Sequence, residues 1–286
     1  MSSVSSRPAL CIGGSTFSFI WKEHALTAME KLLPLGLNDF DVLMVPGHLW
    51  IDEFTPESTA KLRRDLDSRG IRIDSLNLPA LDLNLCSCVG DVRAYSISVY
   101  RKALQCSADL GGRALVVVPG RVSALLAPDK GDTMGWLNDS IAALLKTAER
   151  LDQRLYLELH PQTPIPTSPM IGAFVDQFNS PRVTIAYDIA SAEFIGEDYV
   201  AEISRLGHRI GQFHLSDSTR SAWRHDALGE GTVDVPASLK AIQTSGASAA
   251  VTILEVISAS PIEAMKRSLA VIDGSAHMPA ASATRR

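Results

Sequence analysis

The sequence of 286 residues lacks several features that would identify other classes of protein. No apolar run approaches the roughly 18 residues that a membrane-spanning helix needs, and the N-terminal stretch MSSVSSRPALCIGG lacks the basic-then-apolar order of a secretory signal. The four cysteines show no zinc-type spacing: Cys11, Cys86, Cys88 and Cys106. We therefore predict reduced thiols, a cytoplasmic location and no association with a membrane.

The sequence also lacks an excess of positive charge. Its formal net charge is −5, with 27 Lys and Arg residues against 32 Asp and Glu residues. Nothing in this balance favours nucleic acid as a partner, because nucleic-acid-binding surfaces are basic. Hydrophobic residues make up 46% and charged residues 21% of the chain, which is typical of an ordinary globular protein with a sizeable core.

What the sequence does contain is a series of short apolar runs, each followed by a helical segment. Parallel strands need helical crossovers, and eight of them can close into a barrel. The alternative is an open doubly wound sheet, but no G-x-G-x-x-G follows the first run. We predict the α/β class and a single-domain (β/α)8 TIM barrel over residues 8–274, with disordered tails at 1–7 and 275–286. The predicted strands are 9–14, 40–45, 71–76, 114–119, 155–160, 183–188, 210–215 and 251–256.

Helix boundaries follow from capping residues. Thr55 followed by Pro56 predicts a helix start, and Gly70 predicts its end. In the same way, Asp91 is predicted to cap a helix that runs to Gly111.

Four of the predicted strands end in residues that commonly bind metals. Glu158, Asp188, His214 and Glu255 come from the last four strands, one from each. In a TIM barrel, polar residues at the C-terminal ends of strands belong to the active site. Any one of them alone would more often be a helix cap, an ion-pair partner or a hydrogen-bonded core residue.

Together, these four residues predict a metal site. Burying three carboxylates in one place is costly unless a cation neutralises them. Oxygen donors with one imidazole suit a hard or intermediate cation. We therefore predict one divalent cation, with Mn²⁺ as the first choice and Mg²⁺, Co²⁺ or Zn²⁺ as alternatives.

Three further residues are candidates near the predicted site. His160 follows Glu158 by two positions, so strand alternation turns both side chains into the barrel mouth, where an imidazole can act as a general acid or base. His48, in VPGHLW after the second strand, is a predicted substrate contact at the mouth. Arg121, just after the fourth strand, is predicted to reach an anionic group of the substrate.

The motifs LELH, AYDIAS, FHLSD, HDALGEG and ILEV resemble the xylose-isomerase-like TIM barrel superfamily, which includes sugar phosphate isomerases and epimerases and the AP endonuclease 2-like barrels. The resemblance covers residues 9–272. It implies that the four strand-end residues bind one divalent cation and that Glu158 and Glu255 form the acid/base pair. It also implies that Arg220 and His225 contact substrate and that the protein forms a homodimer or homotetramer.

One position departs from the epimerase pattern that the resemblance provides. Family ketose epimerases have a histidine three residues after the strand-six aspartate, and Ser191 is found there in this chain. The Glu-x-His of Glu158 and His160 is similar instead to 3-dehydroshikimate dehydratases of the same superfamily. Nuclease activity of the endonuclease-IV type is not expected, because the histidines of its zinc site are absent from the loops after the third and fourth strands.

The first functional hypothesis is a metal-dependent isomerase or epimerase. Its substrate would be a small ketose, keto-polyol or sugar phosphate, and a metal-stabilised enediolate would be the intermediate. The alternative is a dehydratase of 3-dehydroshikimate or inosose type, and a second alternative is a non-catalytic barrel that binds its ligand. All three have a small carbohydrate-like molecule as the partner.

Overall fold

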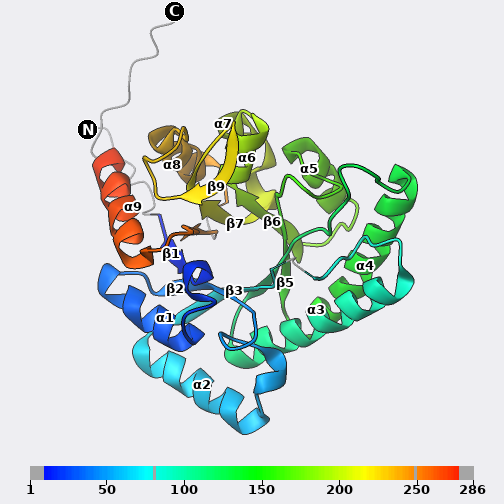
Figure 1. Cartoon of the computed structure of the whole chain (residues 1–286), viewed down its shortest axis with the longest axis horizontal. Helices are drawn as coiled ribbons and strands as arrows, with labels where there is room; N and C mark the ends of the chain where they lie inside the picture. The colour runs from blue at the N-terminus through cyan, green and yellow to red at the C-terminus, as the bar shows by residue number, and fades with distance from the viewer. Residues whose placement is uncertain (1–9, 80–81, 248–249, 277–286) are drawn as a thin grey trace, which may run out of the picture.

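The computed structural model of the chain describes residues 10–79, 82–247 and 250–276, and in it eight parallel strands close into a barrel (Figure 1). The strands follow one another around the barrel in chain order, and the last pairs with the first. This confirms the predicted single-domain (β/α)8 TIM barrel. The strands are β1 (Ile12–Ser15), β2 (Asp39–Leu43), β3 (Arg72–Asn77), β4 (Ala114–Val117), β5 (Arg154–Glu158), β6 (Val183–Asp188), β7 (Ile210–Leu215) and β10 (Val251–Leu254).

A ring of helices surrounds the barrel, and all but the last helix lie between one strand and the next (Figure 1). Two helices instead of one lie between β6 and β7. Among the described residues, no helix is both long and apolar enough to span a membrane. The helices are α1 (Ala25–Leu32), α2 (Pro56–Arg69), α3 (Gly90–Leu110), α4 (Lys130–Arg150), α5 (Ser168–Asp176), α6 (Ile189–Ile195), α7 (Tyr199–Leu206), α8 (Val235–Thr244) and α9 (Pro261–Ala276).

The sequence predicted both boundaries of α2 and the end of α3, where Gly111 adopts the left-handed conformation, but not the start of α3 or the end of α9. Thr55 and Ser58 form a capping box at the start of α2, and Gly70 ends that helix in the left-handed conformation. Asp91, predicted as a cap, lies instead within the first turn of α3, whose N-cap residue is Val89 without a side-chain hydrogen bond. Residues 275 and 276, assigned above to the C-terminal tail, belong to α9, and the remainder of both tails lies outside the described residues.

Several short elements were not predicted. An antiparallel hairpin, β8 (Asp217–Thr219) and β9 (Ala222–Asp226), follows β7 directly and extends from the barrel mouth. The described part of the chain also contains four 3₁₀ segments: η1 (Phe17–Phe19), η2 (Leu33–Leu35), η3 (Ile51–Glu53) and η4 (Gly207–Arg209).

The inside of the barrel contains polar side chains as well as apolar ones. Gln212 on β7 donates hydrogen bonds to Asp74 Oδ2 (2.7 Å) and Ser75 Oγ (2.8 Å) on β3. Because β3 and β7 are not neighbours in the sheet, these bonds cross the interior of the barrel. The hydroxyl of Ser75 in turn donates to buried Asp41 on β2. This network lies directly below the strand ends that carry the predicted site.

Closure of the barrel requires glycine at position 13. A Cβ atom on Gly13 would lie 2.5 Å from the backbone oxygen of Asp39 on the neighbouring strand and 2.8 Å from Ile253 Cδ1. At Gly135 in α4, by contrast, an added Cβ would have no atom within 4 Å.

We expect Gly13→Ala to lower the free energy of unfolding by about 1–3 kcal/mol, because the backbone of β2 must shift to accept the methyl group. Gly135→Ala is the matched control, and it should raise stability by up to about 1 kcal/mol because alanine favours the helix. Equilibrium urea unfolding of both variants tests this, and equal stability of Gly13→Ala and the unchanged protein would contradict it.

Candidate functional site

The four predicted metal ligands lie at one end of the barrel. Glu158 and Asp188 are the last residues of β5 and β6, His214 lies next to the end of β7, and Glu255 follows β10 directly. All four are buried, with exposed fractions between 0% and 7%. His214 Nδ1 is 3.1 Å from Glu158 Oε1 and 3.2 Å from Glu255 Oε2. The structure therefore brings these side chains together, and their role as metal ligands stays a prediction.

Asp188 caps a helix with one carboxylate oxygen and faces the cluster with the other. Its Oδ1 atom accepts hydrogen bonds from the backbone N–H groups of Ala190 (2.9 Å) and Ser191 (3.3 Å), which caps α6. Its Oδ2 atom accepts a bond from the Ser191 hydroxyl (2.5 Å) and lies 3.8 Å from His225 Nε2. The cap holds the carboxylate in place, so the second oxygen faces the cluster in a defined position.

The hydrogen-bond network below the cluster determines which nitrogen of His214 is a donor. Because both amide hydrogens of Gln212 are used by Asp74 and Ser75, its Oε1 atom must accept from His214 Nε2–H (2.8 Å). Arg113 forms an ion pair with Asp74, which is the last contact in this series of polar side chains. In the neutral ring, the Nδ1 lone pair therefore points at two carboxylates, an arrangement that requires a proton or a cation between them.

The electrostatics of the cluster lead to the same requirement. Burial, together with the nearby carboxylates, raises the pKa of Glu158 and of Asp188. Burial opposes protonation of His214, but Glu255 and Glu158 outweigh it and raise the pKa of the ring well above its usual value. The pocket thus favours a positive charge at its centre, and its oxygen and nitrogen donors fit a divalent cation.

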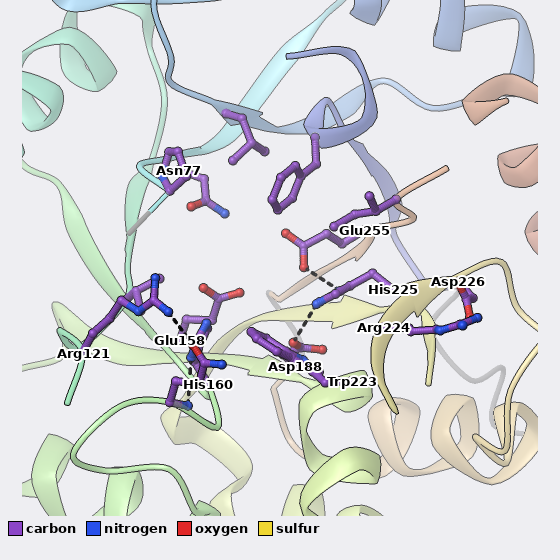
Figure 2. A pocket seen from close by; sticks show the side chains of 16 residues that line it. Asn77, Arg121, Glu158, His160, Asp188, Trp223, Arg224, His225, Asp226 and Glu255 are labelled. Atoms are coloured by element: carbon purple, nitrogen blue, oxygen red, sulfur yellow. Dashed lines mark hydrogen bonds and ion pairs between the residues drawn. The ribbon is translucent and has the colours of Figure 1, made fainter. Parts of the chain in front are cut away.

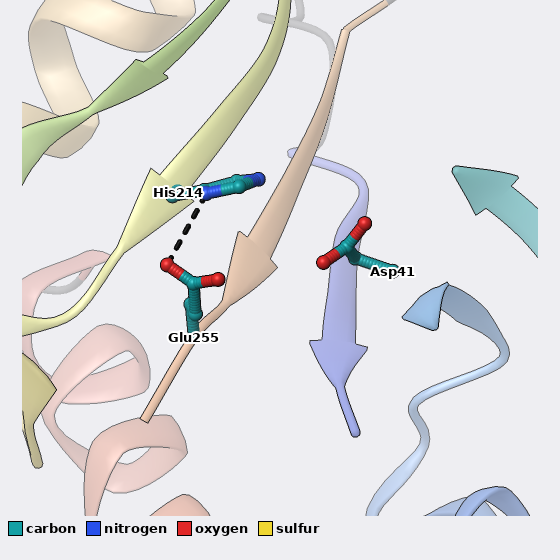
Figure 3. Close-up of side chains that lie close together, drawn as sticks. All are labelled: Asp41, His214 and Glu255. Atoms are coloured by element: carbon teal, nitrogen blue, oxygen red, sulfur yellow. Dashed lines mark ion pairs between the residues drawn. The ribbon is translucent and has the colours of Figure 1, made fainter. Parts of the chain in front are cut away.

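Sequence reasoning missed a fourth buried acid at the site. Asp41 on β2 is fully buried, and its carboxylate lies near His214 and Glu255, with their donor atoms all within 4.8 Å of one another (Figure 3). It accepts hydrogen bonds from Ser75 and from Asn77 Nδ2 (3.0 Å), while burial raises its pKa to about 7. The available signal was an aspartate between Phe40 and Val42 in the middle of the strand DFDVL.

A cavity of about 630 Å³ opens above the cluster. Figure 2 shows Arg121, Glu158 and His160 on one side of the view, and Asp188, His225 and Glu255 on the other. The remaining walls contain several residues that sequence reasoning did not identify. Among them are Phe17, Leu43, Asn77, Val118, Gln162, Trp223, Arg224 and Ile257.

His160 lines the cavity as a neutral hydrogen-bond donor. Its Nδ1 atom accepts a hydrogen bond from the backbone N–H of Gln162 (3.2 Å), so the ring hydrogen is on Nε2. Burial, followed by the charge of Arg121, lowers the pKa of His160 to about 4. A neutral ring with Nε2–H can donate to a substrate oxygen, whereas the general-base role that we predicted would need the free lone pair of Nδ1.

An indole occupies the region of the histidine that the epimerase resemblance expects. Trp223 on β9 donates from Nε1 to the hydroxyl of Ser191 (3.2 Å), the residue found at that position. The same ring packs edge-on against His160, with ring centres 4.6 Å apart. The wall beside Asp188 is therefore more apolar than an imidazole would make it.

Of the other predicted substrate contacts, the structure places His225 and Arg121 at the cavity. His225 lies between two of the carboxylates, with Nδ1 3.3 Å from Glu255 Oε2 and Nε2 3.8 Å from Asp188 Oδ2. It forms a second group of candidate ligands with these two acids. A contact with either the cation or the substrate is compatible with this position.

His48 and Arg220 do not line the cavity, contrary to the sequence prediction. His48 is fully buried, and it donates to the backbone oxygen of Glu23 (2.5 Å) and accepts from the hydroxyl of Thr16 (2.9 Å). Arg220 is exposed at the turn of the hairpin, and its Nε atom lies 3.9 Å from Glu193 Oε1. Both nitrogens of His48 are thus occupied in the core, and the hairpin carries Arg220 outward, so we leave both residues out of the proposed site.

Comparison with known proteins agrees with this architecture. Residues 30–275 match the family described as xylose isomerase-like TIM barrel. A curated relative, L-ribulose-5-phosphate 3-epimerase UlaE from Salmonella paratyphi A, is 24% identical over 242 residues, which cover 79% of this chain and 84% of that protein.

Solved structures share the fold at low sequence identity. An L-ribulose 3-epimerase superposes with a TM-score of 0.78 at 18% identity, covering 93% of this chain and 94% of the other. The IOLI protein with a bound zinc atom superposes with a TM-score of 0.77 at 17% identity, covering 93% and 98%.

Replacing Gln212 tests the network below the cluster. Gln212→Met keeps the size of the side chain but leaves His214 Nε2–H and Asp74 Oδ2 without their buried partner, so we expect a loss of about 1–3 kcal/mol in unfolding free energy. The control is Gln105→Met on α3, where the exposed amide donates to Asp109 Oδ1 (2.9 Å). Urea unfolding measures both, and equal midpoints for the two variants would contradict the importance of the network.

Proposed function

Since the chain belongs to the xylose isomerase-like TIM barrel family, we propose that it is a divalent-metal-dependent isomerase or epimerase of a small ketose, keto-polyol or sugar phosphate. The observation that carries this proposal is the contact of His214 Nδ1 with both Glu158 and Glu255 beneath an open cavity. The epimerase names of the curated relative and of one structural neighbour support it.

We propose Glu158, Asp188, His214 and Glu255 as the ligands of one divalent cation. Mn²⁺ is the first choice, with Mg²⁺, Co²⁺ or Zn²⁺ as alternatives, and the zinc atom bound in one structural neighbour supports a metal in a barrel of this fold. When bound, such an ion polarises a substrate carbonyl and stabilises the negative charge that develops on its oxygen. Asp41 and His225 lie close enough to adjust the charge of the site.

The two glutamates are proposed as the proton-transfer pair. Glu158 and Glu255 project from β5 and from the end of β10, which are separated around the barrel by β6 and β7. Burial raises the pKa of Glu158, whereas for Glu255 the effect of burial is outweighed by His214, which lowers its pKa. This difference favours Glu255 as the base that removes the α-proton and Glu158 as the acid that returns one.

His160 is proposed to hydrogen-bond the substrate oxygen on which charge develops. Its Nε2–H is fixed by the bond that Nδ1 accepts from the backbone of Gln162. A neutral donor of this kind stabilises an enediolate without taking part in the proton transfer. The sequence hypothesis of a catalytic histidine is thus retained with a different role.

A dehydratase of 3-dehydroshikimate or inosose type remains the second candidate. The observation that favours it is the Ser191–Trp223 pair, which replaces the histidine of the family ketose epimerases with a more apolar wall. The same enediolate would then expel a β-hydroxyl instead of regaining a proton. The cytoplasmic location and the homodimeric or homotetrameric assembly stay predictions.

Substitution of the proposed base separates proton transfer from metal binding. We expect Glu255→Gln to lower turnover by about 10²-fold or more, because the amide cannot accept the proton, while metal affinity falls modestly. His160→Asn is the control for metal content, which should stay nearly unchanged because the ring lies outside the proposed ligand set. Elemental analysis after dialysis and steady-state kinetics measure both. Full turnover by Glu255→Gln would refute its role.

Incubation in D₂O with ketoses, ketose phosphates, inosose and 3-dehydroshikimate distinguishes the two candidate reactions. An isomerase or epimerase returns a solvent deuteron to the enediolate, so we expect an isomer that carries deuterium and has lost no water. A dehydratase gives a product lighter by one water. Mass spectrometry reads the outcome directly, and loss of water without a deuterated isomer would establish the dehydratase instead.

A further inference from the structure

We propose that the substrate carries an anionic group, a phosphate or a carboxylate, and that Arg121 binds this group on the His160 side of the cavity. The proposal rests on the proposed function for the reaction at the metal end, and it selects the anionic members of that substrate range. Three features of Arg121 carry it: a rigid backbone frame, a guanidinium without an acidic partner among the described residues, and a neighbouring neutral donor.

The backbone of Arg121 is held by a single side chain from another loop. Asn84, between β3 and α3, accepts from the Arg121 N–H (3.1 Å) and donates to the Arg121 carbonyl oxygen (3.0 Å). The preceding Gly120 has a φ of +76°, and a Cβ there would lie 2.5 Å from Cys86 Sγ. The loop therefore packs directly on Asn84 and Cys86, and a larger residue at position 120 would separate the two loops.

The side chain of Arg121 is oriented by a neutral partner. Its Nη2 atom donates to Gln162 Oε1 (2.7 Å), and the N–H of Val122 donates to the Gln162 backbone oxygen (3.3 Å). Three successive βα loops thus hold this arginine, while only one of its donors has a protein acceptor among the described hydrogen bonds. A guanidinium presents five donors in a fixed fork that matches carboxylate and phosphate oxygens.

The charge of Arg121 is not neutralised by the described part of the protein. No acidic side chain there lies within salt-bridge distance of it. The other arginine that lines the cavity, Arg224, is paired with Asp226 at 3.3 Å. In a chain with a net charge of −5, an oriented and unpaired arginine at a cavity wall is suited to a ligand that brings its own negative charge.

His160 adds a second donor beside the arginine. Gln162 contacts both residues: its Oε1 atom accepts from Arg121 Nη2 (2.7 Å), and its backbone N–H donates to His160 Nδ1 (3.2 Å). Figure 2 shows Arg121 next to Glu158 and His160, on the side away from Arg224 and Asp226. An anion in this part of the cavity would meet one positive charge and one neutral N–H, with Glu158 beside them and Asp188, His225 and Glu255 across the cavity.

The test compares matched substrates with and without the anionic group. The three substrates are a ketose, the same ketose with a terminal phosphate, and the corresponding keto acid. Comparison of the phosphorylated and the carboxylated substrate identifies which anion is recognised. For the unchanged protein we expect kcat/KM to be higher for one anionic substrate. Arg121→Gln should reduce the ratio of anionic to neutral kcat/KM by about 10- to 100-fold, the range for a charged hydrogen bond, and Arg121→Lys should recover part of it.

Two further variants separate position from charge. Arg150→Gln at the end of α4 removes the same charge at the opposite end of the barrel and should leave the ratio unchanged. Asn84→Ala keeps the arginine but releases its backbone, so we expect a higher KM for the anionic substrate with a smaller change in kcat. An equal ratio in the unchanged protein and in Arg121→Gln would overturn the proposal.

Binding of orthophosphate, measured by calorimetry, does not depend on turnover. We expect weak binding that Arg121→Gln reduces about 10-fold or more and Arg150→Gln does not. Arginine-dependent binding without isomerase activity on any substrate would refute the proposed function and keep the anion site. Turnover of neutral ketoses without phosphate binding or anionic preference would keep the function and refute the anion site.

Discussion

The contact of His214 Nδ1 with two buried glutamates is the interaction on which the site depends. Three carboxylates inside a closed barrel repel one another, and desolvation makes their charged forms costly. The barrel compensates from below, where Arg113, Asp74 and Gln212 hold the imidazole by its Nε2–H. The lone pair that remains is directed at the carboxylates, so a positive charge between them satisfies every group in the cluster.

The cavity above this cluster has two chemically different walls. On one side, Glu255, Asp188 and His225 form a group of titratable side chains. On the other, His160 is a neutral donor beside an unpaired arginine, and the indole of Trp223 packs against that histidine. The anionic substrate that we propose would therefore bind in one direction, with its reacting carbons toward Asp188 and Glu255 and its anionic end toward Arg121. Such an orientation limits which carbon atom loses a proton.

The position of a residue, at a strand end or on an irregular segment, decides whether the sequence could predict its place in this site. Residues at strand ends are predictable, since the strand pattern and the barrel rule together place Glu158, Asp188, His214 and Glu255 at one mouth. Side chains on the irregular segments are not, because their direction depends on packing. The hairpin β8–β9 turns Trp223 and Arg224 toward the cavity and Arg220 outward, and the loop after β2 folds His48 into the core.

The sequence by itself determined the eight parallel strands, their order and the set of acidic and imidazole side chains at the strand ends, because strand and helix periodicity and strand-end position are local properties. Only the tertiary structure decided which nitrogen of His214 is free, that Asp41 lies beside it, that His160 is a neutral donor and that Arg121 is oriented by Asn84 and Gln162. Each of these depends on contacts between strands or loops far apart in the chain, and such contacts exist only once the barrel has closed.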